Sequence, residues 1–314
     1  MINKSKISSA NYFRCLKFFK ALLFIVFLLN SRLLKAQEDT DLFLVESKKN
    51  LFGFTIFPET AKKISKGEGY DNQPSFINKS QLVFTSKDPA GNFDVILYNL
   101  DTDKYTNMTR TQGLDEFSPK LTSCGQYIST VRVEKDSSQR IWLYPINFGE
   151  PELLYDDIEP VGYYGWHGET AALFLVGSPN RLVYPYSREE IFEIAENPGR
   201  CISQRPGTNE VVYVDKNSNI ISNGREAYEL KAFDVKSRQT KTKGITLAGE
   251  EDFVWIDKHN LLMARENTIY LKNISKGTDW EEIASLTIPD YHNISRIALS
   301  PDNKNLVITM EPSK

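Results

Sequence analysis

The sequence predicts an all-β protein, a six-bladed β-propeller of four-stranded antiparallel blades. Short apolar runs rich in β-branched and aromatic residues alternate with turns rich in Gly, Pro, Asn and Asp, a pattern typical of antiparallel strands. One such run recurs with separations of 45, 45, 39, 50 and 45 residues, a period that matches one propeller blade. The six runs are 82–84, 127–129, 172–174, 211–213, 261–263 and 306–308.

The repeating unit is clearest in residues 71–109. It has an entry marked by Pro74, the apolar run 82–84, a second apolar run 95–98, and a polar strand around Tyr105. These features predict a meander of four strands. The third strand also recurs, although the chain supplies five copies of it for six copies of the second strand. The five copies are 96–98, 141–144, 182–184, 228–233 and 269–271.

The missing outer strands of the sixth blade are expected at the other end of the chain. Residues 41–46 match a third strand, and residues 52–57 through 62–65 match a fourth. If they complete the sheet begun at the C-terminal end of the chain, the ring closes and no sheet edge is left unpaired. We therefore predict one domain, 38–314, whose last blade is closed by the N-terminal strands.

Residues 1–37 predict a secretory signal peptide. They carry seven basic residues and no acidic residue around an apolar stretch at 21–29, and a small residue, Ala36, lies near the expected cleavage position. The alternative is an uncleaved anchor, but the apolar stretch is shorter than the ~20 residues that a spanning helix needs. The expected location is the periplasm or the extracellular medium, with membrane contact only through an uncleaved leader.

Composition restricts the partners of the exported domain. Loss of the seven leader cations from 38 basic residues leaves 31 against 41 acidic residues, a net charge of −10. Nucleic acids and anionic lipids need clustered Lys and Arg, so neither is an expected ligand. The remaining cysteines, Cys124 and Cys201, fall in different repeats, and we expect two separate thiols.

Repeated motifs at the blade entries indicate a family resemblance. An acid three residues before a proline recurs, and 300–304 reads Ser-Pro-Asp-Asn-Lys between a first and a second strand. The chain resembles exported six-bladed propellers of the TolB-like class and the propeller half of dipeptidyl-peptidase-type serine proteases, without the TolB N-terminal α/β domain or a hydrolase domain. The recurring pairs are Asp71 with Pro74, Glu116 with Pro119 and Asp157 with Pro160.

The sequence does not contain the motifs of the hydrolase that the second relative carries. No Gly-x-Ser-x-Gly nucleophile elbow occurs. His167, His259 and His292 lie in different repeats and do not have the spacing of transition-metal ligands. We therefore expect a protein without enzymatic activity and without a cofactor, calcium excepted.

Acidic residues gather where the chain enters the first strands. We call this face of the ring the mouth, because in a propeller the first strands line the axis. Such acids could bind a basic partner or supply oxygen ligands to calcium. For Asp71, Glu116 and Asp157 the alternative is local turn chemistry, in which short acids accept backbone N–H groups. The full set is Asp71, Asp115, Glu116, Asp156, Asp157, Glu159, Glu250, Glu251 and Asp252.

Glu250, Glu251 and Asp252 break the Asp-x-x-Pro pattern and are the acids most expected to be functional, with Glu251 and Asp252 as the calcium candidates. Tyr163 and Tyr164 are a second candidate surface. Adjacent residues of a strand point to opposite faces, so one of the two is expected to be buried and the other to stack on a sugar or peptide at the mouth. Trp166 and Trp255 are expected to fill the spaces between blades.

Three functional hypotheses follow. The first is a non-enzymatic scaffold of the periplasm or cell envelope that recognises a protein or peptide at the mouth. The second is a calcium-dependent hydrolase or lactonase of the six-bladed class. The third is a subunit of an envelope secretion or motility complex.

Overall fold

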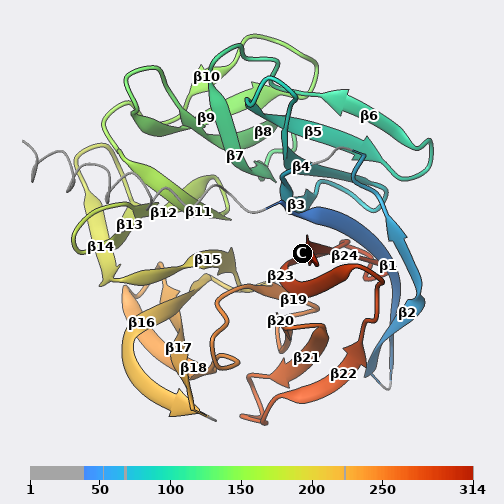
Figure 1. Cartoon of the computed structure of the whole chain (residues 1–314). Helices are drawn as coiled ribbons and strands as arrows, with labels where there is room; N and C mark the ends of the chain where they lie inside the picture. The colour runs from blue at the N-terminus through green and yellow to red at the C-terminus, as the bar shows by residue number, and fades with distance from the viewer. Residues whose placement is uncertain (1–38, 52, 67–68, 223, 314) are drawn as a thin grey trace, which may run out of the picture. The chain divides into compact units, whose positions relative to one another are not determined.

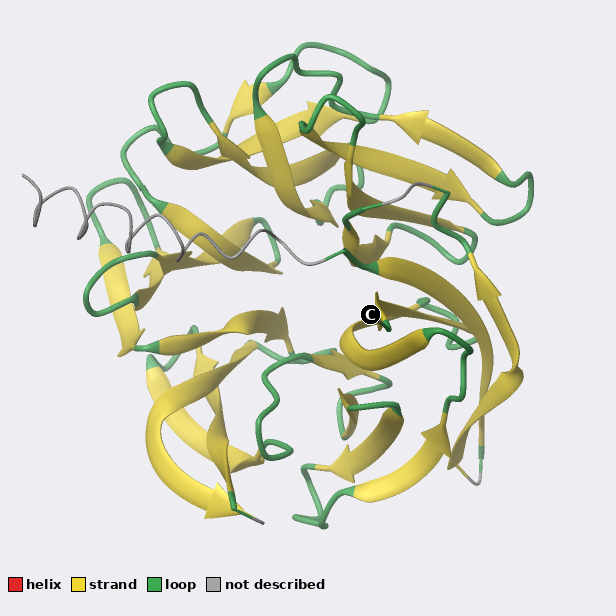
Figure 2. Ribbon diagram, viewed as in Figure 1, coloured by secondary structure: helices red, strands yellow, loops and turns green. Residues whose placement is uncertain are grey.

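The computed structural model describes residues 39–51, 53–66, 69–222 and 224–313, so the predicted leader lies outside the described residues. Within these ranges the chain forms strands and loops (Figure 2), and no helix long and apolar enough to cross a membrane occurs there. Six four-stranded antiparallel sheets form a ring (Figure 1). The predicted fold class is therefore confirmed.

Five blades use consecutive strands. Blade 1 consists of β3 (Asp71–Phe76), β4 (Gln81–Lys87), β5 (Phe93–Asn99) and β6 (Lys104–Asn107). Blade 2 consists of β7 (Asp115–Leu121), β8 (Tyr127–Val133), β9 (Gln139–Pro145) and β10 (Glu152–Leu153). Blade 3 consists of β11 (Val161–His167), β12 (Thr170–Leu175), β13 (Arg181–Pro185) and β14 (Ile191–Glu196).

The remaining blades follow the same plan until the ring closes. Blade 4 consists of β15 (Pro198–Gln204), β16 (Glu210–Ser222), β17 (Arg225–Asp234) and β18 (Gln239–Ile245). Blade 5 consists of β19 (Phe253–Trp255), β20 (Asn260–Arg265), β21 (Thr268–Asn273) and β22 (Glu281–Ser285). Blade 6 consists of β23 (Tyr291–Leu299), β24 (Asn305–Pro312), β1 (Asp41–Asn50) and β2 (Gly53–Lys63).

Blade 6 joins the two ends of the described chain, as predicted. Strands β1 and β24 pair antiparallel from Asp41 opposite Met310 to Glu46 opposite Asn305. The register is fixed by burial, because Val45 and Ile308 are both fully buried in one cluster. A shift by one residue would turn these side chains to the other face of the sheet.

The core lies between the blades rather than at the centre of the ring. In β4, Val83 packs with Ile128 of blade 2, whereas its neighbours Leu82 and Phe84 pack on the other face with Val307 of blade 6. This sheet is thus covered on both faces, which explains why the run Leu82-Val83-Phe84 is uninterrupted by polar residues.

Two further predictions about packing are confirmed. Trp166 packs against the cluster shared by blades 2 and 3, and its Nε1 donates to Ser129 Oγ at 2.9 Å. Trp255 packs against the cluster shared by blades 4 and 5. Cys124 and Cys201 are free thiols. The first strands β3, β7, β11, β15, β19 and β23 are left to line the axis, where they surround one cavity.

Candidate functional site: the central channel

The channel wall of blades 1 and 2 contains two residues in an unusual backbone conformation. Gln73 and Ser118 are 45 positions apart and have φ values of 58° and 55°, in the left-handed region that non-glycine residues rarely adopt. Each precedes a proline and lies at a bulge of its strand. The Oε1 atom of Gln73 accepts the Ser118 N–H at 2.7 Å and the Thr85 hydroxyl at 3.2 Å, which fixes the two strands to one another.

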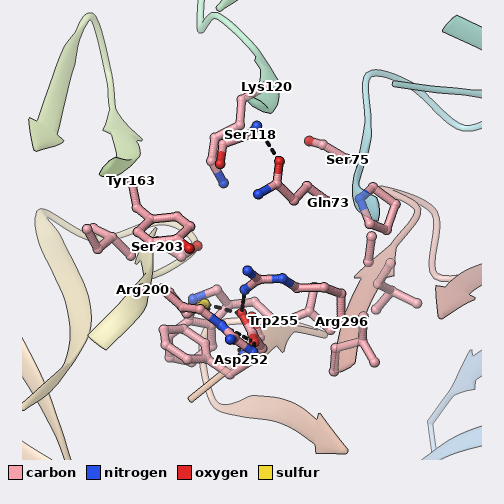
Figure 3. Close-up of a pocket in the computed structure, with 18 of the residues that line it drawn as sticks. Gln73, Ser75, Ser118, Lys120, Tyr163, Arg200, Ser203, Asp252, Trp255 and Arg296 are labelled. Carbon is pink, nitrogen blue, oxygen red and sulfur yellow. Dashed lines mark hydrogen bonds and ion pairs between the residues drawn. The ribbon is translucent and has the colours of Figure 1, made fainter. Parts of the chain in front are cut away.

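The channel holds a cavity of about 370 Å³ to which all six first strands contribute. Its volume is within the range of ligand pockets in proteins. The polar lining consists of three cations, one carboxylate and several hydroxyl and amide groups, and apolar residues such as Phe76 and Leu299 line the rest. The charged and polar side chains of this lining include Gln73, Ser75, Ser118, Lys120, Tyr163, Arg200, Ser203, Asp252, Trp255 and Arg296 (Figure 3).

One carboxylate and two guanidinium groups form an ion cluster in the channel. Asp252, at the entry to β19, accepts hydrogen bonds on Oδ2 from Arg200 of blade 4, including one from Nε at 2.8 Å, and on Oδ1 from Arg296 of blade 6. Burial opposes ionisation of Asp252, but the two arginines outweigh it and lower the pKa of this carboxyl. The cluster therefore carries one negative and two positive charges.

A third cation, Lys120 of β7, reaches into the same space. Figure 3 shows Lys120 on one side of the channel and Arg296 on the opposite side, with Gln73 and Tyr163 flanking the gap. Among the described residues no carboxylate lies within ion-pair distance of the Lys120 ammonium, which instead lies 5.9 Å from the centre of the Tyr164 ring. Burial lowers the pKa of Lys120.

Two of the three acids predicted to face a partner at the end of blade 4, Glu251 and Asp252, are paired within the protein. Glu251 Oε2 accepts the Arg200 N–H at 3.0 Å, and its Oε1 accepts Lys216 Nζ at 2.6 Å. Burial, together with the charge of Asp252, raises the pKa of Glu250 to about 7. Of the three acids, Asp252 lines the central cavity and Glu251 an adjoining one, both as counter-ions of internal cations, whereas Glu250 lines neither cavity and its side chain forms no ion pair among the described residues.

This pairing also bears on the calcium hypothesis. Calcium binds several oxygen ligands at once, and the oxygens of Glu251 and Asp252 are held by Lys and Arg groups. In the part of the chain that the structure describes, no group of three or more His, Cys, Asp or Glu side chains is placed to hold a metal ion. Neither residue is free to act as a calcium ligand in this arrangement.

The acids of blades 1 and 2 have structural partners, but not those that local turn chemistry predicts. Asp115 accepts the N–H of Phe93, which belongs to the neighbouring blade, at 3.0 Å. Glu116 is fully buried, accepts the Tyr144 hydroxyl at 3.0 Å, and has a pKa raised to about 7 by burial. Burial likewise raises the pKa of Asp71 to about 6. These carboxyls stabilise contacts between strands rather than their own turns.

The acids of blade 3 remain at the surface. Asp156 and Asp157 are exposed, and within the described ranges neither forms a hydrogen bond or an ion pair. Glu159 is also exposed, with its carboxylate 3.9 Å from Arg140 Nε. None of the three lines the central cavity.

Tyr163 and Tyr164 point to opposite faces of β11, and one of them is buried, as the sequence predicts. Tyr164 is buried, and its hydroxyl donates to the Ser118 carbonyl oxygen at 2.9 Å. Tyr163 lines the channel, with the Arg296 guanidinium 5.8 Å from the centre of its ring.

A second cavity of about 440 Å³ adjoins the channel on the side of blades 3 and 4. We call it the lateral cavity. It shares Tyr163 and Arg200 with the channel, so these two residues stand at the boundary between the two spaces. Its other lining residues are Phe174, Asn180, Asn197, Pro198, Lys216 and Glu251.

The three cations of the channel are the functional candidates that sequence reasoning missed. Lys120, Arg200 and Arg296 come from three different blades and share no local motif. A usable signal does exist in the sequence. Each lies between a blade entry and a second-strand run, where a side chain faces either the axis or a neighbouring sheet, so a long cation there indicates the axis.

No protein-family model and no curated protein matches the chain. A protein assigned as TolB from Agrobacterium tumefaciens is similar in structure, with a TM-score of 0.60, 10% identity, and coverage of 88% of this chain and 99% of that one. An oligogalacturonate lyase in complex with manganese has a TM-score of 0.54 at 11% identity, covering 82% of both chains.

A chain from a nidogen/laminin complex has the same TM-score of 0.54 at 11% identity, covering 79% of this chain and 94% of that one. Identities this low establish the fold alone. The described part of the chain is a six-bladed β-propeller similar to propellers of the TolB-like class.

Proposed function

We propose that this protein is a non-enzymatic binding scaffold of the cell envelope that recognises a protein or peptide partner at the mouth of its channel. The observation that carries the proposal is the pair of adjoining cavities, the channel and the lateral cavity, which share Tyr163 and Arg200 in their linings. Adjoining cavities with fixed polar groups and an aromatic ring between them favour binding of an extended segment.

Two further observations support this role. The basic and apolar leader predicts export, which places the domain in the envelope or outside the cell. The polar groups of the channel are held in place by contacts between blades, such as the bond from the Ser118 N–H to Gln73. A rigid recess loses little conformational freedom when a partner enters.

Site-specific photocrosslinking in intact cells tests the proposal. A photoreactive residue replaces Tyr163, which borders both cavities, and the control position is Asp101, in an exposed turn of blade 1. We expect a discrete adduct with one envelope protein from position 163 and not from position 101. Stoichiometric co-purification of that protein would identify the scaffold as a subunit of a complex. The same adduct from both positions, or none from position 163, would overturn the proposal.

A further inference from the structure

We propose that the channel binds a single carboxylate group, presented by an extended peptide segment of the partner, and that Lys120 and Arg296 hold it. The inference rests on the proposed function and names the chemistry of the ligand. It follows from the balance of hydrogen-bond donors and acceptors around the channel.

Two strong acceptors of the channel, the Asp252 carboxylate and the Gln73 carbonyl oxygen, are committed to internal contacts. Both carboxylate oxygens of Asp252 accept from arginine, and the Gln73 carbonyl oxygen accepts from the wall. Donors, in contrast, remain available. Trp255 Nε1 is buried without a partner among the described residues, and the Gln73 amide nitrogen donates to none of them. A ligand that fits this lining must supply acceptors.

Lys120 makes the requirement one for negative charge. Its side chain is partly buried and forms no direct ion pair with a carboxylate in the described chain, and Lys120 and Arg296 face the same gap. A charge buried in this way costs stability unless it is paired. Without a ligand in the channel, the unpaired charge lowers the stability of the folded protein. A carboxylate that enters the channel would offset this loss by forming a charge-assisted hydrogen bond.

The charges that line the two cavities limit how much negative charge a ligand can bring. Of the described cations that line the two cavities, Arg200 and Arg296 share Asp252, and Lys216 is paired with Glu251. Lys120 forms no direct ion pair among the described residues, and Asp252 acts on it only through space. The four cations of the two cavities face two carboxylates, Asp252 and Glu251, so two positive charges are in excess, one in the arginine cluster and one on Lys120. One carboxylate between Lys120 and Arg296 can contact both, whereas a longer polyanion would bring more negative charges than the cavities can pair.

The neighbouring surface favours a peptide as the source of that group. Tyr163 and Phe174 continue from the channel into the lateral cavity beside the amide side chains of Asn180 and Asn197. Aromatic rings beside amide groups can pack against an extended backbone and satisfy its N–H and C=O groups. The acidic residue would enter the channel while flanking residues lie in the lateral cavity.

The test compares two synthetic pentapeptide libraries that are identical except for the central residue, which is Glu in one and Gln in the other. Affinity for the exported domain is measured by NMR titration, with tetragalacturonate as a third probe. We expect the best Glu peptides to bind at least tenfold more tightly than their Gln counterparts and than tetragalacturonate. Equal affinity for Glu and Gln peptides, or tighter binding of tetragalacturonate, would overturn the inference.

Variants of the chain provide the second arm. Lys120→Met should weaken binding of the Glu peptides to the level of the Gln peptides and raise the melting temperature, because a partly buried ammonium without a direct carboxylate partner is removed. Lys120→Arg should retain binding. Lys236→Met, at an exposed position of blade 4, should change neither. Unchanged Glu-peptide affinity in Lys120→Met would refute the role of Lys120.

The outcomes separate the two proposals. An adduct from position 163 together with equal binding of Glu and Gln peptides would support the scaffold role and refute the proposal that the channel binds a carboxylate. Absence of that adduct removes the scaffold role itself.

Discussion

At the residue scale, the sequence located the important acids but not their partners. Asp252 was predicted at the mouth from a local run of acids, and it does lie there. Its partners Arg200 and Arg296 lie 52 residues before it and 44 after it. Separations this long do not indicate contact until the blades are arranged in a ring. The run of acids therefore predicts a free acidic surface, whereas in the structure Asp252 is paired with two arginines.

The buried carboxyl of Glu116 predicts a stability that falls as pH rises. Its pKa is raised to about 7, so the folded state holds a proton that the unfolded state releases near its ordinary pKa of 4.5. This contribution is fully present below pH 4.5 and is lost as pH rises through 7. Asp71 and Glu250, also raised, act in the same direction.

Glu116→Gln should therefore flatten the decline in the free energy of unfolding between pH 5 and pH 8, by about 2 to 3 kcal/mol over that range. Urea titrations at several pH values measure this decline. Glu169→Gln, at an exposed turn, is the matched control and should follow the wild-type curve. An unaltered slope in Glu116→Gln would contradict a neutral buried carboxyl.

At the scale of elements, the first strands of the blades contain the residues whose backbone conformation or close packing is most restricted. The period predicted where first strands fall, and Gln73 and Ser118 adopt the same left-handed conformation one period apart. The close approach of β11 to β15 cannot be predicted from the repeat period. It depends on Gly165, whose backbone packs against Ile202 of the next blade, and a glycine within a strand can equally mark a bulge or a bend.

Gly165→Ala should destabilise the contact between blades 3 and 4. A Cβ atom there would lie 2.3 Å from the Ile202 carbonyl oxygen, which belongs to the backbone and cannot rotate away. Overpacking of this kind costs about 1 to 3 kcal/mol, and the urea midpoint measures it. Gly53→Ala is the control, because a Cβ atom added at Gly53 would meet no atom within 4 Å and its φ is not in the left-handed region. Equal midpoints for the two variants would show that the blades are free to separate.

At the scale of the whole molecule, closure of the ring could be predicted from the number of second and third strands in the sequence. Six second strands against five third strands leave one sheet incomplete, and unpaired edges are unfavourable in any sheet. The channel itself was not predictable. Its lining depends on which side chains of six separate strands turn toward the axis, and bulges such as the one between Asn72 and Ser75 change that direction locally.

Removal of the closing strands should produce a chain that self-associates. A chain that begins at Ile64 lacks β1 and β2 and leaves the edge of β24 unpaired. Light scattering should show a larger mass for this chain, and its melting temperature should be lower, than for a chain that begins at Asp39. Equal masses and equal melting temperatures for the two chains would show that closure contributes little.

The pairing of β1 with β24 also determines how the protein responds to force. The first pair, Asp41 with Met310, is the one closest to both ends of the described chain, and the remaining pairs follow it inward. Tension applied between the two ends would therefore peel this ladder one pair at a time instead of shearing all pairs together. A tether at one end and a load at the other would open the ring at blade 6 before any other blade yields.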